Sequence, residues 1–277
     1  MSENGEHSTL DYIPLEGSSF VVAVLRLNRP DFANAFSATM MKEITDFVGQ
    51  VERNANCRAL ILMGVGKHFS AGADLKWMKE SAGLSYSENL KDSSQLLAMF
   101  ESIANLKIPT VALVRGAAYG GAVGLIACCD YALAHEDAKF CLSEVKLGLL
   151  PAVISPYLLR KMKIGSLNRF SLTARVFNAQ EAKESGLVEI VASSDLDEKL
   201  GEEVAQLLAC SPMAQGSIKV LFNHLRNTSF QQSDETVNAI AKARTSVDGQ
   251  AGLQAFFNKT SAPWFVKLPH QSLSLFK

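Results

Sequence analysis

The sequence is poor in the residues that usually build metal centres and disulfide frameworks. Its 277 residues include five cysteines, an odd number without a CxxC pair, so we expect reduced thiols and, from them, a cytoplasmic protein. The five histidines are scattered, and neither an HExxH helix nor a GxSxG nucleophile elbow is present. The chain therefore predicts neither a metal site nor a Ser-His-Asp triad, although spacing alone leaves a triad open.

An excess of one charge and a long apolar run are also absent. Lys and Arg number 27 against 28 Asp and Glu, so the chain has no broad positive field for a nucleic-acid backbone, although a local basic pocket could hold a small anion. The longest uncharged stretch, residues 116–129, is shorter than the roughly 20 apolar residues of a membrane-spanning helix. The N-terminus is polar and acidic, unlike a signal peptide. We expect no membrane span and no export.

Apolar patterning predicts an α/β core followed by a helical C-terminal part. Strand-like runs at 20–27, 58–63 and 110–114 lack polar alternation, which is typical of a sheet covered on both faces. The helical period between Ser37 and Arg53 predicts one buried face, made of Met40, Met41, Ile44, Phe47, Val48 and Val51. From about Pro156 the pattern is mostly helical, with candidates at 179–185, 196–209, 213–227 and 231–246. We divide the chain into a core of residues 1–195 and a helical region of residues 196–277.

The glycine-rich loop after the second strand does not satisfy a nucleotide-binding motif. Gly64 and Gly66 begin a dinucleotide pattern, but Phe69 stands in place of its third glycine. A P-loop would need a glycine where Ile61 stands. The loop therefore predicts neither a dinucleotide nor a nucleoside triphosphate.

Three other segments could carry chemistry, namely residues 69–75, 120–124 and 140–144. Small residues in the first two let the backbone approach a ligand closely, and N–H groups at a helix start favour an oxygen that becomes negative. Two such groups on one carbonyl would form an oxyanion hole, worth about 3–4 kcal/mol per donor. Taken singly, each loop is more typical of ordinary turn glycines.

In this order and spacing, HFSAGAD, GAAYGGAVGLIACCD and FCLSEVKLGLLP resemble the crotonase (enoyl-CoA hydratase/isomerase) superfamily. The likeness extends from LNRP at Leu27 to AFFNKTSAPW near the C-terminus. It implies a crotonase-like ββα spiral core with a helical C-terminal trimerisation region, assembled as a homotrimer or hexamer. It also implies an acyl-CoA thioester substrate whose enolate is held by the backbone N–H groups of Ala73 and Gly121.

Further site residues follow from the resemblance by position. It implies that CoA is part of the substrate and that no separate cofactor is needed. Lys259 alone would be expected to be a solvated charge at a helix end. The implied contacts with substrate or CoA come from Arg29, Ala33, Ser70, Ala71, Gly72, Asp74, Leu75, Gly124, Ala152, Phe256 and Lys259.

The sequence departs from the family at one catalytic position. Family hydratases use two glutamates, of which the second falls on Glu144 and the first on Gly124. Two carboxylates normally divide the base and acid work of adding water. One carboxylate can carry a proton between two carbons, as in enoyl-CoA isomerases, so the lone Glu144 indicates an isomerase.

Finer likeness indicates a hydratase. SEVKLGLLPAVISPYLLR resembles bacterial methylglutaconyl-CoA hydratases of leucine catabolism and related isohexenylglutaconyl-CoA hydratases. Our hypothesis is reversible hydration of 3-methylglutaconyl-CoA to 3-hydroxy-3-methylglutaryl-CoA, with Glu144 as the base and with room for water or a branched acyl chain at Gly124. The alternatives are an isomerase, a decarboxylase of a glutaconyl thioester, and a non-catalytic binding protein.

Overall fold

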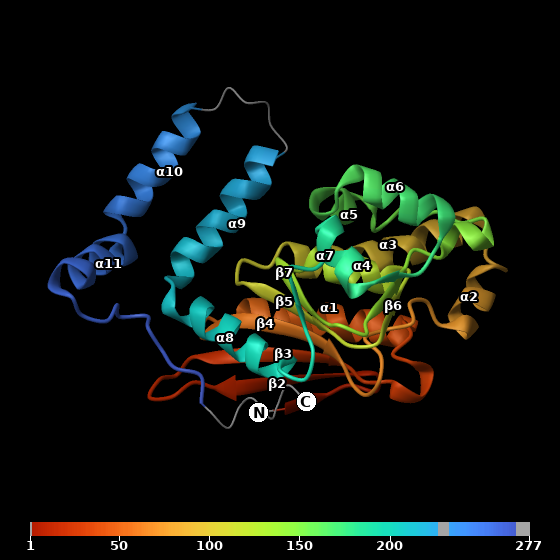
Figure 1. Cartoon of the computed structure of the whole chain (residues 1–277), viewed down its shortest axis with the longest axis horizontal. Coiled ribbons are helices and arrows are strands. Elements are labelled where there is room, and N and C mark those ends of the chain that lie inside the picture. The colour runs from red at the N-terminus through yellow and green to blue at the C-terminus, as the bar shows by residue number, and fades with distance from the viewer. Residues whose placement is uncertain (1, 227–232, 270–277) are drawn as a thin grey trace.

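One large sheet runs through the molecule. The computed structural model describes residues 2–226 and 233–269 (Figure 1). The large sheet has the order β1-β2-β3-β4-β5-β7-β10, in which β1 to β3 are antiparallel and β3 to β10 are parallel. Its strands are β1 Ser2–Asn4, β2 Ser8–Pro14, β3 Val21–Leu27, β4 Cys57–Gly64, β5 Thr110–Val114, β7 Tyr131–His135 and β10 Ile190–Ala192.

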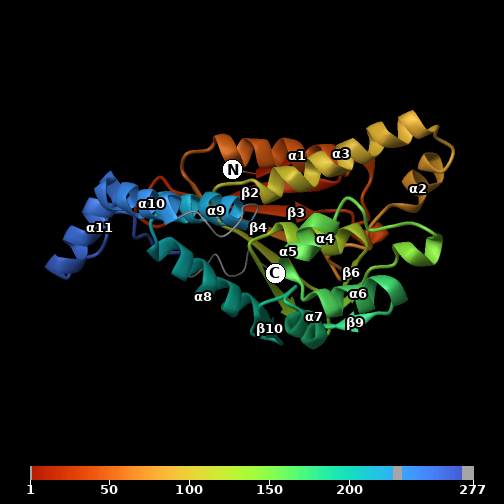
Figure 2. The same ribbon diagram turned by 90° about the horizontal axis from the view of Figure 1, so that it is seen from above.

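Helices cover both faces of this sheet, as the unbroken apolar runs predict. Along β3, Ala23 and Leu25 point into a core that they share with α1 (Ala38–Arg53) and α3 (Tyr86–Ala104). Val22 and Val24 point to the other face, where Leu200 of α8 (Leu196–Ala209) packs. Figure 2 shows α1 and α3 on one side of the strands and α8 on the other.

Local signals in the sequence start the two long helices of the core. Ser37 caps α1 by accepting a hydrogen bond from the Met40 N–H, and the six predicted apolar residues form the buried face of α1. Ser85 and Glu88 form a reciprocal capping box at the start of α3. These caps and periods confirm the predicted helix at residues 37–53.

A small second sheet and several short helices make up the rest of the core together with α4 (Gly121–Cys128). In the small sheet, β6 (Ala117–Tyr119) pairs with β8 (Lys139–Cys141), which pairs with β9 (Phe177–Asn178). The remaining elements of this part are η1 Pro30–Phe32, α2 Leu75–Ser81, η2 Glu144–Leu147, α5 Ser155–Lys161, α6 Ile164–Thr173 and α7 Ala179–Ser185. The apolar helix α4 is buried from Ala122 to Cys128.

The C-terminal part is helical, as predicted. Helices α9 (Pro212–Arg226), α10 (Ser233–Thr245) and α11 (Val247–Asn258) extend beyond the end of the large sheet (Figure 1). The predicted helix ends at Asn227 and Gln231 lie outside the described residues, as does the last part of the region of residues 196–277. Within the described ranges, we find no helix that is long and apolar enough to cross a membrane.

After α11 the chain returns to the core. The buried Arg58 donates hydrogen bonds to the carbonyl oxygens of Trp264 at 2.9 Å and Cys210 at 2.8 Å. The Trp264 indole N–H donates to the carbonyl of Ala209 at 3.1 Å. These bonds fix the base of the C-terminal helices to the sheet. All five cysteines are free thiols, as expected from the sequence.

Candidate active site

The loop that follows β4 is held by its own backbone and by one buried hydroxyl. The Ser70 Oγ donates to the carbonyl of Asn34 at 2.7 Å and accepts from the Gly72 N–H at 3.1 Å. Phe36 pairs with Ala73 in a parallel bridge, in which the Phe36 N–H donates to Gly72 and the Phe36 carbonyl accepts from Asp74. In such a bridge the N–H of Ala73 points away from Phe36. Among the described residues, this N–H has no hydrogen-bond acceptor.

A second turn lies directly against this loop. A Cβ atom on Gly72 would lie 2.5 Å from the carbonyl oxygen of Tyr119 and 3.8 Å from the Cα of Gly120. Gly121 is the first residue of α4, and its N–H has no acceptor in the part of the chain that the structure describes. The structure thus places the unpaired amides of Ala73 and Gly121 on adjacent turns, one of them at a helix N-terminus.

Glu144 lies beside the second turn. It is the first residue of η2, and its Oε1 would lie 3.3 Å from a Cβ atom on Gly120. Its Oε2 is buried and has no hydrogen-bond partner among the described residues. Burial raises the pKa of this carboxyl above its ordinary value. A half-buried carboxylate with an unpaired oxygen next to two unpaired amides can exchange protons with a bound ligand.

The space at Gly124 contradicts one expectation from the sequence. A Cβ atom on Gly124 would lie 2.1 Å from the Cγ2 of Ile154 and 3.2 Å from the Phe100 ring. Ile154 is buried, so its side chain fills the volume in which we expected water or a branched acyl chain. That expectation is wrong because a residue from the segment after Glu144 packs directly against α4.

The comparisons with known proteins decide the family. A model of the enoyl-CoA hydratase/isomerase family matches residues 18–267. The chain belongs to this family. An enoyl-CoA hydratase structure from Shewanella pealeana is 42% identical with a TM-score of 0.86, over 92% of this chain and 95% of that one. The structure of AtuE from Pseudomonas aeruginosa is 32% identical with a TM-score of 0.86, over 92% of this chain and 98% of that one. A Thermus thermophilus relative, provisionally named an enoyl-CoA hydratase, is 34% identical over 86% of this chain and 95% of its own.

These likenesses confirm the crotonase-like α/β core with its helical C-terminal region and make the chain an enzyme of the hydratase/isomerase family. The most specific of its sequence motifs coincide with the described site. Ala73 lies in HFSAGAD, Gly121 in GAAYGGAVGLIACCD and Glu144 in FCLSEVKLGLLP. Their catalytic roles stay predictions at this point.

Two residues predicted to contact CoA, Asp74 and Arg29, use their side chains for hydrogen bonds within the protein. The Asp74 carboxylate caps α2 through the N–H groups of Lys76 and Trp77 and lies 3.0 Å from the Arg29 Nη1. Burial would raise the pKa of Asp74, but these bonds outweigh it and hold the pKa below its ordinary value. Arg29 also donates to the carbonyl of Ala35. Both side chains thus shape the loop that carries Ala73.

The other residues predicted to contact CoA near this loop differ in how exposed they are. The Ala33 carbonyl accepts a hydrogen bond from the Ala71 N–H at 2.8 Å, which ties η1 to the loop. Leu75, at the start of α2, is 84% exposed. Ala152 lies on an exposed turn two residues before Ile154. Ser70 is fully buried, so its hydroxyl is not open to a ligand.

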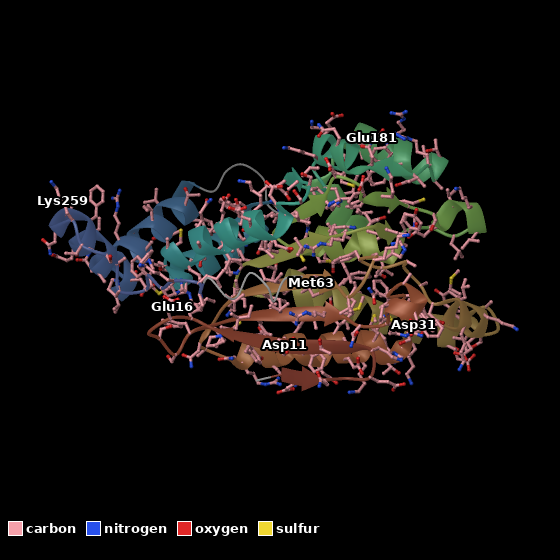
Figure 3. The ribbon with its side chains drawn as sticks, turned by 60° about the horizontal axis from the view of Figure 1, so that its bottom comes forward. Asp11, Glu16, Asp31, Met63, Glu181 and Lys259 are labelled. Atoms are coloured by element: carbon pink, nitrogen blue, oxygen red, sulfur yellow. The ribbon has the colours of Figure 1, made fainter. Side chains whose placement is uncertain are left out.

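Phe256 and Lys259 are not brought to this site within one chain. Both lie at the exposed end of α11, where Lys259 ends the helix in a left-handed conformation. Figure 3 labels Lys259 at one end of the molecule and Asp31, close in sequence to Arg29, toward the other. A contact of Phe256 or Lys259 with the ligand of such a site would therefore need a second copy of the chain.

Asn34 is a structural residue of the site that the sequence analysis missed. It is fully buried, its Nδ2 donates to the carbonyls of Val65 and His68, and its Oδ1 accepts from the Arg29 N–H. The available signal was an asparagine four residues after a proline in a turn, because asparagine tolerates left-handed backbone and bonds to nearby main chain. Asn34 fixes the start of the loop that leads to Ala73.

Proposed function

We propose that the protein reversibly adds water to the double bond of an α,β-unsaturated acyl-CoA, with 3-methylglutaconyl-CoA as the substrate and 3-hydroxy-3-methylglutaryl-CoA as the product. The observation that carries the proposal is the half-buried Glu144 carboxylate, which has an unpaired Oε2 and lies beside Gly120, on the turn where the unpaired amides of Ala73 and Gly121 are adjacent. CoA enters this reaction only as part of the substrate.

The proposed chemistry uses one carboxylate twice. The thioester oxygen accepts hydrogen bonds from the amides of Ala73 and Gly121, which stabilise its negative charge as an enolate forms. Water adds its oxygen to the β-carbon while one of its protons passes to the Glu144 carboxylate. Glu144 then gives that proton to the α-carbon as the enolate returns to a thioester. One water is consumed, and Glu144 ends in its starting state.

The glutaconyl substrate and the family are supported by different observations. The names of the relatives extend only to enoyl-CoA hydratase or enoyl-CoA hydratase/isomerase. The glutaconyl substrate and the place in leucine catabolism are proposed from the likeness of SEVKLGLLPAVISPYLLR to methylglutaconyl-CoA hydratases. The free cysteines support the proposed cytoplasmic location.

A homotrimer or hexamer belongs to the same proposal. Helix α9 has no buried residue, and Ile218, Val220 and Phe222 are each about half exposed on it. Apolar side chains in such number on projecting helices support contact with other copies of the chain. Phe256 and Lys259 would then meet the CoA of a neighbouring copy.

One observation favours isomerisation as the second candidate. Because Ile154 fills the space at Gly124, a second carboxylate has no room there. A 1,3-proton shift needs only one carboxylate, which removes a proton from one carbon and returns it to another. Glu144 alone satisfies that requirement.

Incubation with 3-methylglutaconyl-CoA separates the candidates by product mass. We expect a product heavier by one water, and a matching loss of water when 3-hydroxy-3-methylglutaryl-CoA is supplied. A product lighter by one carbon dioxide would identify a decarboxylase. Unchanged mass with a shifted double bond would identify an isomerase, and no turnover of this or simpler enoyl-CoA thioesters would overturn the enzymatic proposal.

The rate of hydration is expected to fall on acidification at a pH above the ordinary pKa of a glutamate. Burial raises the pKa of Glu144, and the base must be ionised to accept a proton from water, so kcat/KM decreases as the pH falls through this raised value. A pH profile of kcat/KM measures the midpoint. An acid limb whose midpoint lies at or below the ordinary pKa of glutamate would contradict the burial of Glu144.

A further inference from the structure

Glu144 and Ile154 are the two ends of one surface stretch. Residues 145–150 are exposed, with Leu147 at 59% and Leu150 at 77%. Between Val145 and Ile154, every residue of which the structure describes, only Ile154 is buried. In the stretch that follows the proposed base, Ile154 is thus the one fully buried side chain, and Val153 beside it is only partly buried against the same core.

Both ends of this stretch meet α4 at a glycine. The Glu144 Oε1 faces Gly120, immediately before the helix, and the Ile154 Cγ2 faces Gly124, one turn later. A residue with a side chain at position 124 would collide with Ile154, which would lie only 2.1 Å from the added Cβ. Glycine is unfavourable inside a helix, so the close approach of Ile154 gives it a structural reason here.

The hydrogen bonds of the stretch shape it but do not bind it to α4. The Leu149 N–H donates to the Glu144 carbonyl at 3.0 Å, and the Ser155 hydroxyl donates to the Pro151 carbonyl at 2.7 Å. Helix α6 packs against η2. The contact of the stretch with α4 at Gly124 is therefore made by the apolar side chain of Ile154.

We propose that Ile154 is a positioning residue for Glu144: packed into the space at Gly124, it holds the exposed stretch so that the carboxylate stays beside Gly120 and the start of α4. It acts through Glu144 without touching substrate. The inference depends on the proposed function only in taking Glu144 as the base.

Two variants of nearly equal chemistry test the contact. Ile154→Val keeps the branch at Cβ and is expected to keep kcat within about twofold, because the conservative change preserves the contact at Gly124. In Ile154→Leu the side chain keeps the same number of carbon atoms but has no branch at Cβ and so no Cγ2. We expect kcat to fall about 10-fold or more with little change in KM. Ile164→Ala, at a 59% exposed residue on α6, is the control and should leave kcat unchanged.

The glycine can be tested from the other side. Gly124→Ala should lower kcat by about 10-fold or more by displacing Ile154, and Ile154→Ala in the same chain should restore part of it. Gly165→Ala is the matched control, because no atom lies within 4 Å of its added Cβ. Equal losses in Gly124→Ala and in the double variant would overturn the coupling.

A measurement without substrate separates this inference from the proposed function. Titration of the Glu144 carboxyl by carbon-13 NMR, assigned by its absence in Glu144→Gln, should give a lower pKa in Ile154→Leu because the carboxyl becomes hydrated. That shift is expected even if no enoyl-CoA is turned over, in which case only the proposed function fails. A folded Ile154→Leu protein with unchanged Glu144 titration and, where there is turnover, unchanged kcat would overturn the positioning role.

Discussion

Glu144→Gln is expected to lower kcat for hydration by about 100-fold or more, because glutamine keeps the shape of glutamate but accepts no proton from water. The substitution should not lower the stability of the folded protein. Burial raises the pKa of Glu144, so the ionised side chain costs stability in the folded state. Below the unfolded-state pKa that cost is absent, and as the pH rises through the folded-state pKa it appears in full. The neutral variant should therefore be at least as stable as the parent at neutral pH.

Steady-state kinetics and thermal unfolding of the purified protein check both parts of this prediction. Glu52→Gln is a suitable control, because Glu52 is exposed on α1 and the substitution removes the same charge as Glu144→Gln. It should change neither kcat nor the unfolding temperature appreciably. If Glu144→Gln keeps kcat within about threefold of the parent, the proton acceptor is another group.

Features that depend on local patterns could be predicted from the sequence. The face of α1 is an example, because a period near 3.6 places Met40, Ile44, Phe47 and Val51 on one side whatever the helix packs against. The unbroken apolar strands likewise predicted a sheet buried on both faces, and α1 and α8 cover it. The adjacency of Ala73, Gly121 and Glu144 was implied by family resemblance rather than by any local pattern.

Features that depend on contacts between distant segments could not be predicted. Gly124 looked like open space because the sequence does not show that Ile154 reaches it from beyond Glu144. The loop that contains Ser70 and Asp74 is predicted to contact CoA, but a sequence does not tell which way the polar side chains of such a loop face. Here Ser70 bonds to Asn34, and Asp74 caps α2.

The other large effect is expected at Gly72, on the loop that carries Ala73. Gly72 has a φ of +88°, and an added Cβ would lie 2.5 Å from the carbonyl oxygen of Tyr119. Gly72→Ala must therefore push the turns before Ala73 and Gly121 apart. Loss of one oxyanion donor typically costs about 100- to 1,000-fold in kcat. We expect a loss in this range, with a much smaller change in KM, because the amides matter most when the thioester oxygen becomes negative.

The collision can be separated from backbone strain. Gly17 also has a positive φ, +65°, but no atom lies within 4 Å of its added Cβ. Gly17→Ala should therefore lose about 1 kcal/mol of stability, the typical cost of forcing alanine into left-handed backbone, and keep its kcat. A folded Gly72→Ala protein that behaves like Gly17→Ala would show that the spacing of the two turns is unimportant. A selective loss of kcat in Gly72→Ala would instead tie catalysis to that spacing, since both variants share the strain and only one has the collision.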